Sequence, residues 1–163
     1  MQWANALKDY QIYLRLERGL SENSISSYTY DIQGFIDYLE TYNPQLTITN
    51  CQKADTQAYI YHLAKNINAR SQSRQISGLK SFFNFLIFEG YREDSPMDLI
   101  DTPKIGRKLP AVLGIKEIDQ LLTAIDLSHA QGYRNLTILE TLYGSGLRVS
   151  VLINLKISDL HFD

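Results

Sequence analysis

Arg148 is the residue whose type and surroundings most directly suggest chemistry. It follows Gly144-Ser145-Gly146, a turn that glycine makes at low cost because it tolerates positive φ, and it precedes a short apolar-periodic segment. A guanidinium in so apolar a setting is costly unless it is paired. Arg148 could form an internal ion pair with a carboxylate such as Asp159, or it could bind a phosphate, which suits its planar fork. Spacing alone favours the ion pair, because structural arginine pairs are common.

A second group of basic and hydroxyl side chains lies on a predicted helix over about 70–89. At 100° per residue its large apolar side chains cluster on one side, and its polar side chains form a stripe on the other. An ordinary solvated helix face would more usually include glutamates, but this stripe contains no acid. It therefore predicts contact with DNA phosphates or guanine edges. The stripe consists of Arg70, Arg74, Ser77, Ser81 and Asn84, and the predicted DNA-binding residues of this helix are Arg70, Arg74, Ser77, Lys80 and Ser81.

A basic linker is predicted after this helix and a short turn. Residues 101–112 have no hydrophobic period, and they contain two prolines, one glycine and three basic residues, Lys104, Arg107 and Lys108. This composition is typical of a connection between two domains. If the linker crosses a duplex, its cations would contact phosphates and add sequence-independent affinity that weakens with salt.

The distribution of charge is more informative than the net charge of −2. Residues 51–88 hold five basic residues and one acidic residue, and residues 102–116 hold four basic residues and no acidic one. Segregation of this kind favours an anionic partner, such as the double-stranded DNA that the arginine stripe predicts, and the alternative of two solvated basic surfaces without a function stays open.

Other features of the sequence argue against several classes of protein. The apolar runs are too short to span a membrane and no signal peptide is visible, so we expect a cytoplasmic protein without a membrane partner. The single cysteine, Cys51, cannot form an internal disulfide, which fits a reducing cytoplasm. The three histidines lack metal-ligand spacing and no Gly-rich phosphate loop is present. We therefore expect no metal, no cofactor and no small-molecule ligand.

The hydrophobic periodicity predicts an all-α fold in two domains. Residues 1–100 are expected to form a four-helix bundle, with helices over 3–18, 21–39, 53–66 and 70–89. Residues 113–163 are expected to form helices over 115–125 and 134–143, a short segment after Arg148, and a first β-strand over 155–163, where apolar side chains alternate. A lone strand without a partner is not a finished domain, so the second domain is expected to be incomplete.

Three segments resemble the tyrosine site-specific recombinases, the Xer/phage-integrase family. Gly146-Leu147-Arg148-Val149-Ser150-x-Leu152-x-x-Leu155 is similar to the motif that carries the first catalytic arginine of that family. The run from Leu20 to Phe35, with Tyr28, Asp31 and Ile32, resembles its N-terminal domain. The run from Arg74 to Leu86 is similar to its fourth core-binding helix, which lies along DNA.

This resemblance implies a SAM-like core-binding domain followed by the beginning of a catalytic domain. In that family a tyrosine hydroxyl attacks the scissile phosphate, forms a 3′-phosphotyrosyl link and frees a 5′-hydroxyl, without a cofactor. Arg148 would then be a catalytic residue that stabilises the charge developing on the phosphate. The implied partners are double-stranded DNA and sister recombinase subunits, which form a tetramer on DNA.

Some features of the recombinase family are altered or absent. Val151 stands where a glutamate is common, and Thr29 and Tyr30 stand where basic residues are frequent. The family's lysine, its His-x-x-Arg motif, the following His or Trp and the nucleophilic tyrosine have no counterpart, so we expect this chain not to cleave DNA by itself. Two alternatives to a recombinase half stay open. One is a naturally truncated DNA-binding module or regulator, and the other is a helical protein-interaction domain without DNA affinity.

Overall fold

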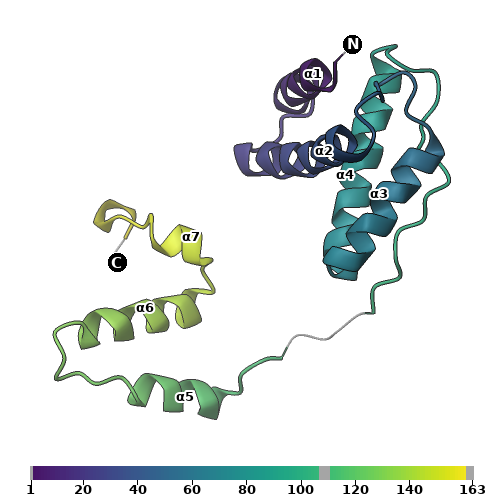
Figure 1. Cartoon of the computed structure of the whole chain (residues 1–163). Coiled ribbons are helices and arrows are strands. Elements are labelled where there is room, and N and C mark those ends of the chain that lie inside the picture. The colour runs from purple at the N-terminus through teal and green to yellow at the C-terminus, as the bar shows by residue number, and fades with distance from the viewer. Residues whose placement is uncertain (1, 107–110, 161–163) are drawn as a thin grey trace. The chain divides into compact units, whose positions relative to one another are not determined.

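The computed structural model describes residues 2–106 and 111–160. The chain forms two compact units, Met1–Arg107 and Lys108–Asp163. Figure 1 shows that each unit consists of helices joined by turns and loops. The predicted all-α fold is therefore confirmed for the part of the chain that the structure describes.

The first unit is organised around its last helix. Its elements are α1 (Trp3–Leu16), α2 (Glu22–Tyr42), α3 (Lys53–Asn66) and α4 (Ala69–Phe88). Helix α4 packs against each of the other three, and α1 also packs against α2. The apolar face that periodicity predicts for α4 explains this central place, because Ile76, Leu79 and Phe83 are fully buried.

Aromatic side chains dominate the core of the first unit. Trp3 of α1 packs edge-to-face on Phe35 of α2 with 5.6 Å between ring centroids, and Phe35 packs on Phe83 of α4 at 6.1 Å. Tyr10 of α1 lies against Phe82 of α4 at 5.2 Å. Such pairs add about 0.5–1.5 kcal/mol each to the free energy of burial. The rings therefore fix the mutual orientation of α1, α2 and α4.

Short polar side chains and a glycine set the helix ends of the first unit. Ser21 precedes α2, and its Oγ accepts a hydrogen bond from the backbone N–H of Ser24, as predicted for an N-cap. Asn68 caps α4 in the same way through the N–H of Ser71 at 2.9 Å. Gly19 has a φ of 59°, a left-handed conformation in which the chain turns away from α1 at low cost. These boundaries follow from local sequence.

A buried arginine closes the loop after α4. The Nη1 group of Arg92 donates to the carbonyl oxygen of Ile48, and its Nε donates to the carbonyl oxygen of Asp94 at 3.0 Å. Its guanidinium also lies over the ring of Phe83, 5.7 Å from the centroid. Because each of these groups would be costly to bury alone, Arg92 ties the loop after α4 to the segment between α2 and α3.

The second unit is smaller and more open. Its elements are α5 (Ile115–Thr123), α6 (Gly132–Ser145), α7 (Val149–Leu152) and the 3₁₀ turn η1 (Ile157–Asp159), and α6 packs against both α5 and α7. Gly146 follows α6 with a φ of 60°, as the glycine turn predicts. Within residues 111–160 only Gly132 is buried, so the apolar side chains of these helices stay accessible to solvent.

One predicted element is wrong. The alternation over 155–163 predicts a β-strand, whereas Ile157–Asp159 form a 3₁₀ turn and no strand occurs within residues 2–106 and 111–160. A strand needs a neighbour for its backbone hydrogen bonds, and the described part of this unit supplies none. The turn satisfies one such group locally, because the N–H of Lys156 donates to Asp159 Oδ2 at 3.0 Å. Residues 161–163 lie outside the described residues.

The described residues were searched for membrane-spanning helices and for metal sites. The helices that the structure describes include none that is long and apolar enough to cross a membrane. The described side chains also include no group of three or more His, Cys, Asp or Glu residues arranged to hold a metal ion.

Candidate nucleic-acid interface

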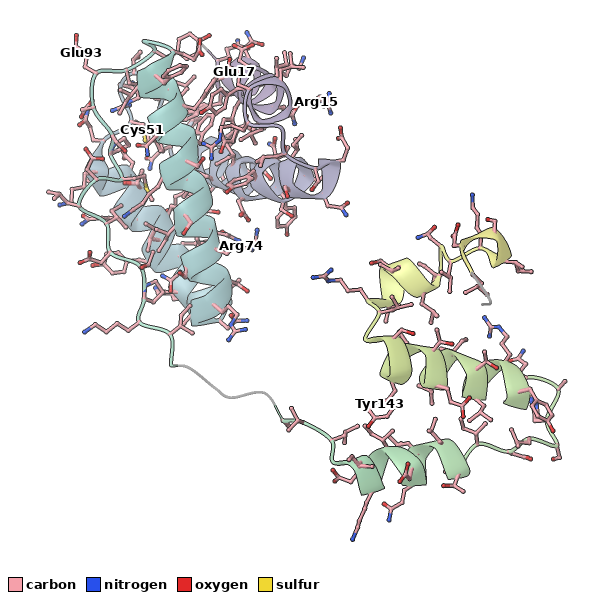
Figure 2. All side chains as sticks on the ribbon, turned by 180° about the vertical axis from the view of Figure 1, so that it is seen from behind. Arg15, Glu17, Cys51, Arg74, Glu93 and Tyr143 are labelled. Atoms are coloured by element: carbon pink, nitrogen blue, oxygen red, sulfur yellow. The ribbon has the colours of Figure 1, made fainter. Side chains whose placement is uncertain are left out.

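A groove of about 370 Å³ lies between α2 and α4. Both helices contribute to it, and most of its lining side chains carry a hydroxyl, an amide or a charge. Figure 2 shows Arg74 at the side of α4, and this is the cation of the groove. The lining residues are Asn23, Ser24, Ser27, Tyr28 and Asp31 from α2, and Arg74, Ser77 and Gly78 from α4.

Arg74 and Asp31 form an ion pair across the two helices. Nη1 of Arg74 lies 2.5 Å from Oδ2 of Asp31, and the side chains are 49% and 3% exposed. The other carboxylate oxygen, Oδ1, is buried without a hydrogen-bond partner among the described residues. Burial raises the pKa of Asp31 above its usual value, and the charge and hydrogen bond of Arg74 oppose that shift. Arg74 is thus anchored at one nitrogen while half of its side chain faces solvent.

Gly78 makes room for this pair. A Cβ atom at position 78 would lie 3.2 Å from Asp31 Oδ2 and 3.3 Å from Asp31 Cβ. Contacts this tight would require the Asp31 side chain to shift by a few tenths of an ångström, so the small residue lets α4 approach α2 closely at this point.

The predicted DNA-binding residues of α4 differ in their exposure to solvent. Arg70 and Ser77 are exposed, whereas Lys80 and Ser81 are partly buried. Ser81 Oγ accepts a hydrogen bond from the Tyr10 hydroxyl at 2.8 Å, which joins α1 to α4. Burial raises the pKa of Tyr10 to about 12, although its hydrogen bond to Ser81 opposes that shift. Only Arg74 and Ser77 of the predicted residues line the groove.

The other predicted site residues lie apart from the groove or outside the described residues. Lys104 is exposed. Arg107 and Lys108 lie outside the described residues. Arg148 is exposed at the N-cap of α7, and no described acid lies within ion-pair distance of it. The internal pair with Asp159 is therefore not formed, and the binding of a phosphate by Arg148 stays a prediction.

Sequence reasoning missed the contribution of α2. Asn23, Ser27 and Asp31 recur every four residues and so lie on one face of the helix, which is the face that lines the groove. The available signal was Asp31 itself. It lies between Tyr28 and Ile32 of the apolar stripe, and a charge at the edge of a buried face requires a partner.

Comparison with known families decides what kind of domain contains this groove. Residues 7–90 match the family model described as phage integrase, N-terminal SAM-like domain. The chain belongs to this family. The SAM-like integrase domain includes α2, α3 and α4 entirely, and with them every residue that lines the groove. The resemblance inferred from the motifs is confirmed.

Curated proteins named tyrosine recombinase XerD are similar to the chain over nearly its full length. The one from Oceanobacillus iheyensis is 40% identical over 157 residues, which cover 96% of this chain and 52% of the relative. The one from Listeria monocytogenes is 35% identical over 156 residues, which cover 95% and 52%. This integrase-family chain therefore spans about half the length of the curated relatives it matches.

Two solved structures share the fold. The Tn1549 transposon integrase, in complex with circular intermediate DNA, has a TM-score of 0.71 at 18% identity, over 100% of this chain and 52% of that one. The integrase from mycobacterium phage Brujita has a TM-score of 0.54 at 19% identity, over 88% of this chain and 46% of that one. At these identities the likeness establishes an integrase-like fold and nothing finer.

Proposed function

We propose that this chain is the DNA-binding part of a tyrosine recombinase and that it binds duplex DNA with the groove between α2 and α4. The observation that carries the proposal is Arg74, a half-exposed arginine anchored by a buried carboxylate in a groove of hydroxyl and amide groups. Arg70 and Ser77 extend the same helix face, and α4 contains no acidic residue. A basic, acid-free face of this kind suits the phosphate backbone.

The relatives and fold neighbours support this proposal. Their printed names are tyrosine recombinases and integrases, and one of them was solved with DNA. In this proposal residues 1–100 form the core-binding domain, residues 101–112 the linker and residues 113–163 the first part of a catalytic domain. Lys104, Arg107 and Lys108 would add phosphate contacts, and Lys80 and Ser81 are proposed DNA contacts that lie outside the groove lining.

We assign Arg148 the role of stabilising charge on the scissile phosphate in a complete recombinase. It is exposed and lies between Gly146, whose backbone is left-handed, and the first residue of α7. An arginine held in this way can offer several N–H groups to a phosphate as negative charge develops. Cleavage and rejoining through a 3′-phosphotyrosine, with sister subunits in a cytoplasmic setting, are proposed for the complete enzyme. No cofactor is part of this proposal.

Fluorescence anisotropy with a labelled random-sequence duplex at two or more salt concentrations tests the DNA-binding proposal. We expect affinity to fall steeply with salt, and Arg74→Ala to weaken binding and reduce the slope of log affinity against log salt by about one. Arg70→Ala should act in the same direction. Arg134→Ala is the matched control, because it removes an exposed arginine from α6. Affinity that is indifferent to salt and to both α4 substitutions would contradict DNA binding and would favour a protein-interaction domain.

A further inference from the structure

Asp31 is a buried carboxylate at the centre of a proposed DNA-binding face, where an acid should weaken binding. We propose that Asp31 is a positioning residue that orients Arg74, and that the α2–α4 groove takes one backbone phosphate of duplex DNA. This inference rests on the proposed function and deepens it. It names the ligand group that the groove accepts and assigns a role to a residue that the phosphate itself does not touch.

The groove offers hydrogen-bond donors to a phosphate. One guanidinium nitrogen of Arg74 is used on Asp31, and an arginine has five N–H donors, so several stay available in the half-exposed side chain. The side-chain amide of Asn23 and the hydroxyl of Tyr28 have no partner among the described residues, and both line the groove. Arginine, amide and phenol donors around one cavity match the oxygens of a phosphate.

The hydroxyl groups of Ser27 and Ser77 donate to their own helix backbones. Ser27 Oγ donates to the carbonyl oxygen of Asn23 at 2.8 Å, and Ser77 Oγ donates to that of Ser73 at 2.9 Å. Because a carbonyl oxygen only accepts, the hydroxyl protons of both serines are already used. The direct donors to the phosphate are therefore Arg74, Asn23 and Tyr28. The third serine of the lining, Ser24, shares a hydrogen bond of 3.0 Å with Ser21 Oγ, in which either hydroxyl can be the donor.

Asp31 is placed to orient Arg74 and is too deeply buried to meet DNA. Its side chain is 3% exposed, and its Oδ2 lies 2.5 Å from Arg74 Nη1 and close to Gly78, where a Cβ would be only 3.2 Å away. A long exposed arginine loses rotamer freedom when it is held on a ligand. Pairing with a fixed carboxylate removes most of that freedom before DNA arrives. Among the described residues Arg74 is the side chain that hydrogen-bonds this carboxylate, and Oδ1 has no partner there.

Positioning of Arg74 and simple charge repulsion by Asp31 predict opposite changes in DNA affinity for Asp31→Asn. A carboxylate near a phosphate repels it and neutralises the arginine, so Asp31→Asn would then tighten binding. If Asp31 orients Arg74, the same substitution weakens binding, because the guanidinium is released into many rotamers. The sign of the change in DNA affinity therefore separates positioning from simple charge.

A double-mutant cycle on the full chain measures the coupling, with anisotropy on a random-sequence duplex as readout. We expect Asp31→Asn to weaken binding roughly three- to tenfold when Arg74 is present, which is the usual cost of ordering one long side chain. In the Arg74→Ala background Asp31→Asn should leave affinity unchanged or slightly tighter. Glu22→Gln is the matched control: it removes a carboxylate from the exposed Arg15 pair of the same helix, with the same change of charge.

Arg74→Lys provides a second variant that does not depend on how well Asp31→Asn folds. An ammonium keeps the charge but cannot bridge a carboxylate and a phosphate with a planar fork, so we expect a loss close to that of Arg74→Ala. Full affinity of the lysine variant overturns the inference, and so does an equal effect of Asp31→Asn with and without Arg74. In both cases salt-dependent binding by the unmodified chain would leave the proposed function standing. Absence of any duplex binding overturns both.

Discussion

The first unit buries its apolar side chains and the second leaves them accessible, although both are built from amphipathic helices. In the first unit a continuous core links all four helices, and the largest buried side chains include Tyr10, Phe35, Phe82 and Phe83. In the second unit the apolar residues of α5 and α6 line an open groove of about 270 Å³. Figure 2 labels Cys51 among the crowded side chains of the first unit and Tyr143 beside that groove.

The difference shows that amphipathicity is necessary for a core but does not make one. Helix α5 separates apolar from polar residues clearly, yet Leu121 stays 52% exposed, because among the described elements α6 is the one that packs closely against α5. Helix α4 has three partners and leaves no large aliphatic side chain of its central turns exposed. Stability should therefore be concentrated in the first unit, and substitutions of equal chemistry should differ in effect between the units.

The largest expected effect comes from deleting a core ring. Phe83→Ala should lower the free energy of unfolding of the first unit by about 3–5 kcal/mol, because the ring is fully buried and packs on Trp3 and Phe35. Leu121→Ala in the second unit should cost about 0.5 kcal/mol or less. Urea unfolding monitored by circular dichroism measures both variants, and the rate at which a thiol reagent modifies Cys51 reports on the first unit.

Cys51 is a suitable probe of the first unit. The thiol is fully buried, and burial raises its pKa to about 12, so it is protonated and unreactive until the unit opens. We expect Phe83→Ala to speed modification strongly and Leu121→Ala to leave it unchanged. If both variants accelerated modification of Cys51 equally, the two units would unfold together, and the proposed difference in their stability would be contradicted.

A smaller effect is expected from the buried arginine of the first unit. Arg92→Ala leaves the carbonyl oxygen of Ile48 without its buried donor, and this should cost about 2–3 kcal/mol. Arg134→Ala, which removes an exposed arginine from α6, should be close to neutral. Thermal unfolding monitored by circular dichroism measures the two variants. A neutral Arg92→Ala would mean that the loop after α4 is not part of the folded unit.

The smallest effect is a difference in pH dependence. Burial raises the folded-state pKa of Asp31, so the folded state holds this proton more tightly, and stability from this group is lost as pH rises above the usual pKa of an aspartate. Relative to wild type, Asp31→Asn should therefore become less unfavourable as pH rises through that range. Hydrogen bonds from Ser128 lower the pKa of Asp126 in the second unit, so its contribution is lost as pH falls.

The stability contributed by Asp31 thus falls as pH rises, whereas that contributed by Asp126 falls as pH drops. Unfolding midpoints of the two variants, measured across the acid range, distinguish these trends. Asp126→Asn is the control for Asp31→Asn, because it replaces the same residue type in the more open unit. If both variants changed stability in the same direction with pH, the difference in burial between the two sites would be contradicted.

Much of the fold could be predicted because its signals are local. The cap at Ser21, the glycine that follows α1 and the period of α4 are all contained within a few turns of chain. The family motifs in Leu20–Phe35 and Arg74–Leu86 fall within the residues that match the SAM-like model. The strand expected over 155–163 failed for the opposite reason, since a strand depends on a neighbour that is not local.

The candidate site was only half predictable. The helical period correctly placed Arg74 and Ser77 on one side of α4, but it could not show that Asp31, 43 residues earlier, would pair with Arg74. That pairing depends on how α2 crosses α4, which is decided by packing of the whole unit. Ser81 shows the same limit: the period places it on the polar stripe, but α1 reaches that edge and its Tyr10 takes Ser81 as a partner.

The close approach at Gly78 has a consequence for chimeras between related domains. A donor α4 with any larger residue at this position would bring a Cβ to within 3.2 Å of the Asp31 carboxylate of the host. A donor α2 without the aspartate would leave the host Arg74 without its anchor. Residues 31, 74 and 78 therefore form a module that is best exchanged as a set. This module is smaller than a domain, yet its residues come from two helices.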